Sequence, residues 1–174
     1  MDDTIYFRGT EAGRVSVEPE GLYYRLSASA AEPGPGVWRL WGCFGAESRC
    51  LGVLFPGEGG LRLERRVSMH SWPVLPDSFV LGRETEGFRP WRGVLEGQEV
   101  PDAMIRTEAG SLTLALFAPP EGPVPFAERT DQMREARLDG RDCLVLEIEN
   151  GTPNIFNFQR SILNSPEQGT AGAQ

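Results

Sequence analysis

The single histidine of the chain, His70, lies between two serines, Ser68 and Ser71. A histidine beside a hydroxyl group could act as a general base toward a serine nucleophile. Catalytic triads are assembled in space rather than along the chain, however, and the sequence has no Gly-x-Ser-x-Gly elbow. We therefore expect His70 to be a polar loop residue, and the sequence predicts no catalytic residue.

Two of the three cysteines, Cys43 and Cys50, flank a predicted hairpin loop at residues 45–48. If the loop is centred on Ala46 and Glu47, the cysteines face each other with Cβ atoms ~4.5–5.5 Å apart. A disulfide prefers ~3.8 Å, so the two form either a labile redox pair or two reduced thiols. No CxxC motif or histidine accompanies them, and we expect no metal site and no cofactor.

Two carboxylates, Glu147 and Glu149, share one face of a predicted strand and lie about 6.6–7 Å apart. Inverting glycosidases separate their two carboxyl groups by ~6.5–9.5 Å. Such a pair normally flanks a cleft from different elements, whereas adjacent acids on one strand usually form a solvated face. The pair therefore supports carbohydrate chemistry only as an alternative.

Tryptophan and arginine residues form the best candidate binding surface. Trp72, Trp91 and Arg92 lie in irregular segments, where exposed aromatic rings beside guanidinium groups suit recognition of a sugar, a peptide or a protein. In the predicted strand 61–68, alternation places Arg65 on the apolar face, where it needs an acidic partner or lines a pocket. The predicted binding residues are Trp72, Trp91, Arg65, Arg66 and Arg92.

The charge balance narrows the classes of partner. The chain has 17 basic residues, all of them arginine, against 25 acidic residues, and its formal net charge is −8. Because diffuse negative charge repels polyanions, we expect no nucleic-acid partner. No apolar stretch approaches the ~20 residues that span a bilayer, so no membrane partner is expected. The acidic N-terminus lacks a signal-peptide pattern and the cysteine number is odd, which predicts a cytoplasmic protein.

Gly and Pro interrupt short runs of β-branched, aromatic and aliphatic residues throughout the chain, which predicts an all-β fold. We expect about ten to twelve mostly antiparallel strands, packed as a β-sandwich or an irregular barrel, with little helix. Residues 130–138 fit either a short helix that ends at Gly140 or a strand of a hairpin that turns at Asp139–Gly140; the hairpin is favoured. The clearest expected strands are residues 14–18, 22–30, 37–44, 49–55, 61–68 and 111–117.

A single all-β domain is expected over residues 1–151. Turn residues dominate near residues 85–101, which makes this segment the candidate subdivision. Residues 152–174 are expected to form a partly disordered C-terminal tail. Sheet edges left unpaired in an open sandwich favour a homodimer.

A run at residues 21–26, followed by Arg39-Leu40 and by residues 51–56, resembles a pattern in uncharacterised β-rich proteins of anaerobic gut Firmicutes. The likeness covers the N-terminal part of the chain, and its motifs are structural. It implies a bacterial cytoplasmic protein and assigns no catalytic residue.

The scarcity of acid–base and metal-binding groups, beside many aromatic and arginine residues, favours a non-enzymatic binding or protein-interaction module. The alternative is a carbohydrate-binding or carbohydrate-active domain that uses exposed tryptophan and paired carboxylates. This alternative requires Trp72 or Trp91 to line a groove. A third hypothesis is a redox-responsive protein that uses Cys43 and Cys50.

Overall fold

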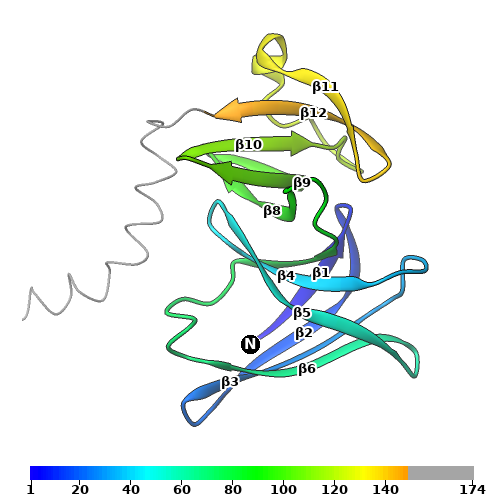
Figure 1. Ribbon diagram of the computed structural model, residues 1–174, viewed down its shortest axis with the longest axis vertical. Helices are drawn as coiled ribbons and strands as arrows, with labels where there is room; N and C mark the ends of the chain where they lie inside the picture. Colours follow the sequence, from blue (N-terminus) through cyan, green and yellow to red (C-terminus); the bar gives the residue numbers. More distant parts are fainter. Residues whose placement is uncertain (149–174) are drawn as a thin grey trace, which may run out of the picture.

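A computed structural model describes residues 1–148 of the chain. These residues form twelve strands and one 3₁₀ helix, which confirms the predicted all-β class. The strands are divided between a closed seven-stranded barrel and a five-stranded sheet, stacked one above the other in Figure 1. The predictions for Glu149 and for the tail 152–174 fall outside the described residues.

The barrel has the strand order β1-β2-β3-β6-β5-β4-β7, and its neighbours are antiparallel except where β1 meets β7. The choice between a sandwich and an irregular barrel was therefore only partly right, because a second sheet lies outside the barrel. The barrel strands are β1 (Asp2–Phe7), β2 (Thr10–Glu20), β3 (Tyr23–Ala30), β4 (Trp38–Phe44), β5 (Glu47–Gly57), β6 (Gly60–Ser68) and β7 (Ser78–Gly82).

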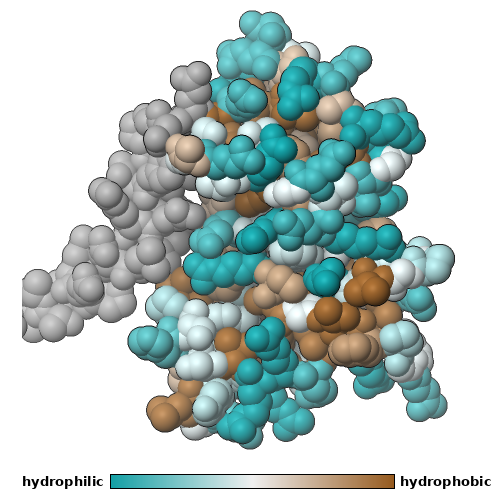
Figure 2. Space-filling model, viewed as in Figure 1, coloured by the Kyte–Doolittle hydropathy of each residue, from teal (hydrophilic) through white to brown (hydrophobic). Residues whose placement is uncertain are grey.

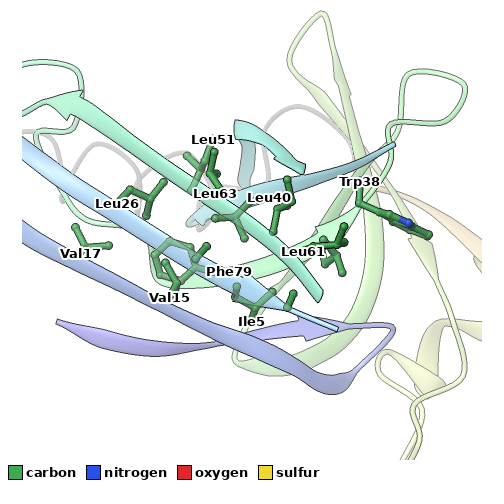
Figure 3. Packing of buried hydrophobic residues seen from close by; sticks show 14 of the residues in the cluster. Ile5, Val15, Val17, Leu26, Trp38, Leu40, Leu51, Leu61, Leu63 and Phe79 are labelled. Atoms are coloured by element: carbon green, nitrogen blue, oxygen red, sulfur yellow. The ribbon is translucent and has the colours of Figure 1, made fainter. Parts of the chain in front are cut away.

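Alternating side chains fill the barrel. On β2, Val15 and Val17 point inward and are buried, whereas Arg14 and Glu18 are exposed. The same period of two on β3 buries Leu26 and its neighbours on one face. Figure 3 shows these aliphatic side chains gathered with those of the opposite strands in one cluster. The barrel interior is therefore a packed core.

Besides Glu86–Gly87 at the isolated Thr85–Phe88 bridge, four turns that join paired strands contain two residues with positive φ, the requirement of a type I′ turn. At Asp139–Gly140, for example, the φ values are 53° and 71°. Glycine is favoured at the second position because it adopts positive φ without steric cost. The other three pairs are Arg8–Gly9, Glu96–Gly97 and Ala109–Gly110.

The seam between β5 and β6 is only partly paired. Within residues 1–148 the two strands pair from Phe55–Arg62 to Gly57–Gly60 and diverge beyond this point. Arg65 extends across the seam, and its Nη1 donates a hydrogen bond to the Leu51 carbonyl at 2.5 Å. The predicted partial burial of Arg65 is wrong, because the residue is exposed, and its partner is a main-chain oxygen rather than a carboxylate.

The second sheet has the strand order β11-β12-β10-β9-β8. One of its faces packs on the outside of the barrel, where Trp41, Cys43 and Val80 join its own buried side chains. The candidate subdivision near residues 85–101 falls where the chain passes from the barrel into this sheet. Its strands are β8 (Arg89–Leu95), β9 (Gln98–Glu108), β10 (Ser111–Leu116), β11 (Arg134–Leu138) and β12 (Arg141–Ile148).

The ambiguous segment 130–138 contains the end of a short helix and a strand. The 3₁₀ helix η1 (Ala127–Gln132) ends before β11, which pairs with β12 across the Asp139–Gly140 turn. The favoured hairpin is therefore confirmed.

No helix within residues 1–148 combines the length and the hydropathy that a membrane span requires.

Candidate functional site

A cleft of about 1000 Å³ lies where the barrel meets the second sheet. Asp77 and Ser78, at the start of β7, contribute from the barrel. The end of β8 and the beginning of β9 contribute from the sheet, and the proline-rich segment 121–128 completes the lining. Gly45, in the turn between β4 and β5, also lines the cleft, which is thus built from four parts of the chain that are distant in sequence.

Two aliphatic side chains are exposed in this cleft. Val94 is 61% exposed and Val124 is 44% exposed. Pro123 and Pro125 flank Val124, and their fixed φ angles restrict the conformations of this segment. Exposed apolar residues that cluster in a concave site, rather than singly, are typical of a binding surface.

The charges that line the cleft are mainly acidic. Asp77, Glu99, Glu121 and Glu128 contribute carboxylates, against the single guanidinium group of Arg92. Asp77 accepts a hydrogen bond from a main-chain amide and Glu128 accepts one from Gln98. Within residues 1–148, Glu99 and Glu121 form no ion pair, so their charges remain available to a cationic ligand.

Arg92 lies against the barrel wall. Its guanidinium carbon is 3.5 Å from the centre of the Tyr6 ring, a cation–π contact. Its Nη1 is buried and has no hydrogen-bond partner within the described residues. The Arg92 carbonyl accepts a hydrogen bond from Ser78 Oγ at 3.1 Å, which joins β8 to the start of β7. Arg92 therefore connects the barrel and the sheet in the wall of the cleft.

The turn between β4 and β5 is held against the second sheet beside the cleft. Trp91 Nε1 donates to the Gly45 carbonyl at 2.9 Å, and the Gly45 amide donates to Asp77 Oδ2 at 2.7 Å. Ser48 Oγ donates to the Pro90 carbonyl at 2.6 Å. Figure 1 shows this hairpin reaching from the barrel toward the sheet. The main-chain and side-chain bonds fix the shape of the cleft before any ligand binds.

A smaller cavity, of about 340 Å³, lies beside the same turn and is lined in part by Glu47, Arg89 and Arg106. Glu47 and Arg89, two of its charged groups, are engaged within the protein. Arg49 contacts both carboxylate oxygens of Glu47, and Arg89 Nη1 donates to the Ser48 carbonyl at 3.0 Å. The cleft at Val94, with unengaged carboxylates and exposed apolar side chains, is the better candidate site.

The expectation that Trp72 and Trp91 are exposed is wrong. Trp72 is 6% exposed and packs against Tyr24 and Phe44 in the barrel core. Trp91 is 1% exposed and lies between the barrel and the sheet. Burial of such large apolar rings stabilises the fold more than their exposure in loops would allow. Neither ring is available to stack on a sugar.

The predicted arginines are not gathered in one place. Arg65 bridges the β5–β6 seam, and Arg66 lies 4.5 Å from the Tyr23 ring on the outside of the barrel. Of the five predicted binding residues, the structure places Arg92 in the lining of the cleft and Trp91 next to it.

The expected placement of Cys43 directly opposite Cys50 is also wrong. The turn is centred on Gly45–Ala46, so Cys43 pairs with Ser48. The same register continues along the hairpin and places Cys50 opposite Trp41. Cys43 is fully buried, Cys50 is exposed, and both are free thiols. Their different locations argue against a shared disulfide.

Burial raises the pKa of the Cys43 thiol from 9.0 to about 11. The unfolded chain therefore loses this proton more readily than the folded protein. The stability that the protonated Cys43 thiol contributes is fully present below pH 9. As the pH rises through 11, the free energy of unfolding falls by about 2–3 kcal/mol. Urea unfolding between pH 8 and 11 should show a steeper loss of stability for the wild type than for Cys43→Ala. Parallel pH profiles would contradict this effect.

The remaining candidates show no catalytic arrangement. The contact between His70 and Ser68 runs from the His70 main-chain amide to Ser68 Oγ, and the His70 side chain is exposed. Glu147 is exposed on β12 opposite Thr113, and its predicted partner Glu149 lies outside the described residues. Among residues 1–148, no three His, Cys, Asp or Glu side chains are grouped to hold a metal ion.

Sequence reasoning missed Val94, Glu99, Glu121 and Val124, which give the cleft its character. Val94 and Glu99 lie in the segment 85–101, where turn residues dominate and predict no binding surface. The only local signal was an apolar residue, Val124, held between two prolines. The assembly of these residues depends on the packing of the sheet on the barrel.

Comparison of the chain with protein-family models, with curated proteins and with solved structures finds no match. Its function must therefore be inferred from its own geometry.

Proposed function

We propose that this protein is a non-enzymatic interaction module, and that its cleft binds an extended peptide segment of a protein partner. The peptide carries a basic side chain next to an aliphatic one. The observation that carries this proposal is the exposure of Val94 and Val124 in a cleft with four carboxylates.

The cleft is large enough to hold several side chains of a peptide, and its walls are held in place by the fold. A volume of about 1000 Å³ is at the upper end of the range for ligand pockets, ~300–1,000 Å³. The proline-rich segment 121–128 and the hydrogen-bonded β4–β5 turn are already ordered, which reduces the conformational entropy that is lost on binding. The aliphatic side chain of the peptide would contact Val94 and Val124, and its cation would approach Glu99 and Glu121.

The chemistry near the cleft favours binding over catalysis. Cys43 is linked to this region through Ser78 and Arg92, but the thiol is buried and its pKa is raised to about 11. It is therefore protonated at neutral pH and is a poor nucleophile. The burial of Trp72 and Trp91 leaves no observation that favours the carbohydrate alternative. Cytoplasmic localisation, bacterial origin and homodimer formation stay predictions.

Selection of a random peptide library on the purified protein should enrich peptides in which Lys or Arg adjoins Val, Leu or Ile. The double variant Glu99→Gln/Glu121→Gln should bind the enriched peptides about fivefold more weakly, because exposed charge pairs contribute ~0.2–1 kcal/mol each. The loss should shrink with added salt. Fluorescence anisotropy of a labelled peptide would measure both effects.

The matched control is Glu58→Gln/Glu135→Gln, which changes the net charge equally at two exposed positions outside the cleft lining. It should leave the affinity unchanged. Equal weakening by both double variants would attribute binding to net charge alone, and enrichment of acidic peptides would contradict the proposal.

A further inference from the structure

A row of polar side chains crosses the outside of the barrel on three neighbouring strands. Arg14 on β2 pairs with Ser29 on β3, and Ser29 pairs with Arg62 on β6. Paired residues in antiparallel strands point to the same side, so both arginines flank the Ser29 hydroxyl on the outer face. Two strand spacings, about 9.5 Å, separate the backbones of the arginines. Their long side chains can therefore converge above Ser29.

A second row, two residues along the strands, runs parallel to the first. It contains Asp2, Ser16, Ser27 and Glu64 on β1, β2, β3 and β6. Serines occupy the middle of both rows, and longer side chains lie at the ends of the rows. This distribution of sizes produces a hollow of about 500 Å³ on the barrel wall.

Of the two carboxylates of this hollow, Glu64 is engaged within the protein, whereas Asp2, like the two arginines, forms no ion pair within residues 1–148. Glu64 accepts a hydrogen bond from Ser27 Oγ at 3.0 Å and forms an ion pair with Arg25 at 3.5 Å. Arg14 Nη1 donates a long hydrogen bond to Thr4 Oγ1, at 3.5 Å. Within residues 1–148, neither Arg14 nor Arg62 forms an ion pair. Two guanidinium groups thus remain free to bind an oxyanion, in a protein of net charge −8.

An apolar surface adjoins the hollow at Arg62. Phe55 on β5 pairs with Arg62, so its side chain lies on the same outer face, and it is 65% exposed. Trp38 on β4 pairs with Leu54 on β5, so Val37, which precedes Trp38, lies near Phe55. Val37 is 57% exposed. Figure 2 shows a hydrophobic patch on the side of the barrel formed by β4 and β5. A ligand held above Ser29 could therefore extend an apolar group onto Phe55.

We propose that this hollow binds a small organic oxyanion, a phosphate ester or a carboxylate, whose apolar part rests on Phe55 and Val37. Arg14 and Arg62 hold the oxyanion by bidentate hydrogen bonds, and Ser29 donates its hydroxyl. The site lies on a different surface from the peptide cleft, and it does not depend on the peptide proposal.

Amide chemical shifts of the ¹⁵N-labelled full chain, titrated with phenyl phosphate, test the site directly. Shifts are expected at Arg14, Ser29, Arg62 and Phe55, with tighter binding than inorganic phosphate because of the apolar contact. A parallel titration with phenylacetate tests a carboxylate in place of the phosphate ester. The anion with the lower Kd identifies the preferred oxyanion. Benzyl alcohol, which lacks the charge, should bind at least tenfold more weakly.

The variant Arg62→Gln should weaken phenyl phosphate binding about tenfold, because a hydrogen bond to a charged group contributes ~1.5–3 kcal/mol. Arg66→Gln, on the same strand and with the same change in charge, should leave the affinity unchanged, and Arg14→Gln provides an independent second variant. The proposal is overturned if no shifts appear at these residues, if Arg66→Gln weakens binding as much as Arg62→Gln, or if benzyl alcohol binds equally well.

Discussion

Replacing Trp91 by alanine is expected to lower the free energy of unfolding by about 3–5 kcal/mol, the cost of truncating a fully buried aromatic side chain. Trp91 is 1% exposed and lies between the barrel and the second sheet. Its Nε1 also donates to the Gly45 carbonyl at 2.9 Å. The substitution therefore removes apolar contacts and releases the turn beside the cleft.

Urea unfolding of two further variants separates these contributions. Trp91→Phe keeps most of the apolar area and loses the hydrogen bond to Gly45, and we expect a cost of about 1–3 kcal/mol. Val94→Ala removes an exposed side chain of the cleft and should change stability by less than about 0.5 kcal/mol. A Trp91→Ala protein as stable as the wild type would show that the sheet does not depend on this contact.

Replacing Arg141 by methionine is expected to cost about 2–4 kcal/mol. Arg141 contacts both carboxylate oxygens of Asp102, and the Asp102 side chain is only 8% exposed. The Arg141 guanidinium also lies 3.9 Å from the Phe117 ring centre. Loss of one partner of a buried ion pair typically costs about 3–5 kcal/mol. We expect a smaller cost for Arg141→Met because the Arg141 side chain is 22% exposed to solvent.

The double variant Asp102→Leu/Arg141→Met should be more stable than Arg141→Met alone, because it leaves no buried carboxylate without a partner. The exposed pair of Arg137 and Asp142 on the same hairpin is the control, and Arg137→Met should cost at most about 0.5 kcal/mol. Denaturant midpoints of the four proteins would measure these differences. Equal costs for Arg141→Met and Arg137→Met would contradict the importance of burial.

Local patterns predicted much of the fold because they act over a few residues. Alternation along 14–18 and 22–30 identified β2 and β3, and Asp139–Gly140 marked the turn between β11 and β12. Alternation also placed Arg65 on the apolar face of β6, but the residue is exposed. Its actual partner, the Leu51 carbonyl, depends on the divergence of β5 from β6 and has no local signal.

The candidate site was harder to predict because it depends on register and on packing between sheets. A turn centred on Gly45–Ala46 places Cys43 opposite Ser48 and Cys50 opposite Trp41, which separates the two cysteines. Trp91 was read as an exposed loop residue because β8 was not recognised as a strand. The packing of β8 on the barrel buries the Trp91 ring and leaves Val94 exposed, and this packing has no local signal in the sequence.

The most direct test of the peptide cleft is a titration of the ¹⁵N-labelled protein with a selected basic–aliphatic peptide, followed by amide chemical shifts. The proposal predicts saturable shifts concentrated at Val94, Glu99 and Val124, with little change at Ser29 on the distant barrel wall. Shifts concentrated elsewhere, with the cleft residues unchanged, would contradict the assignment of this cleft as the binding site.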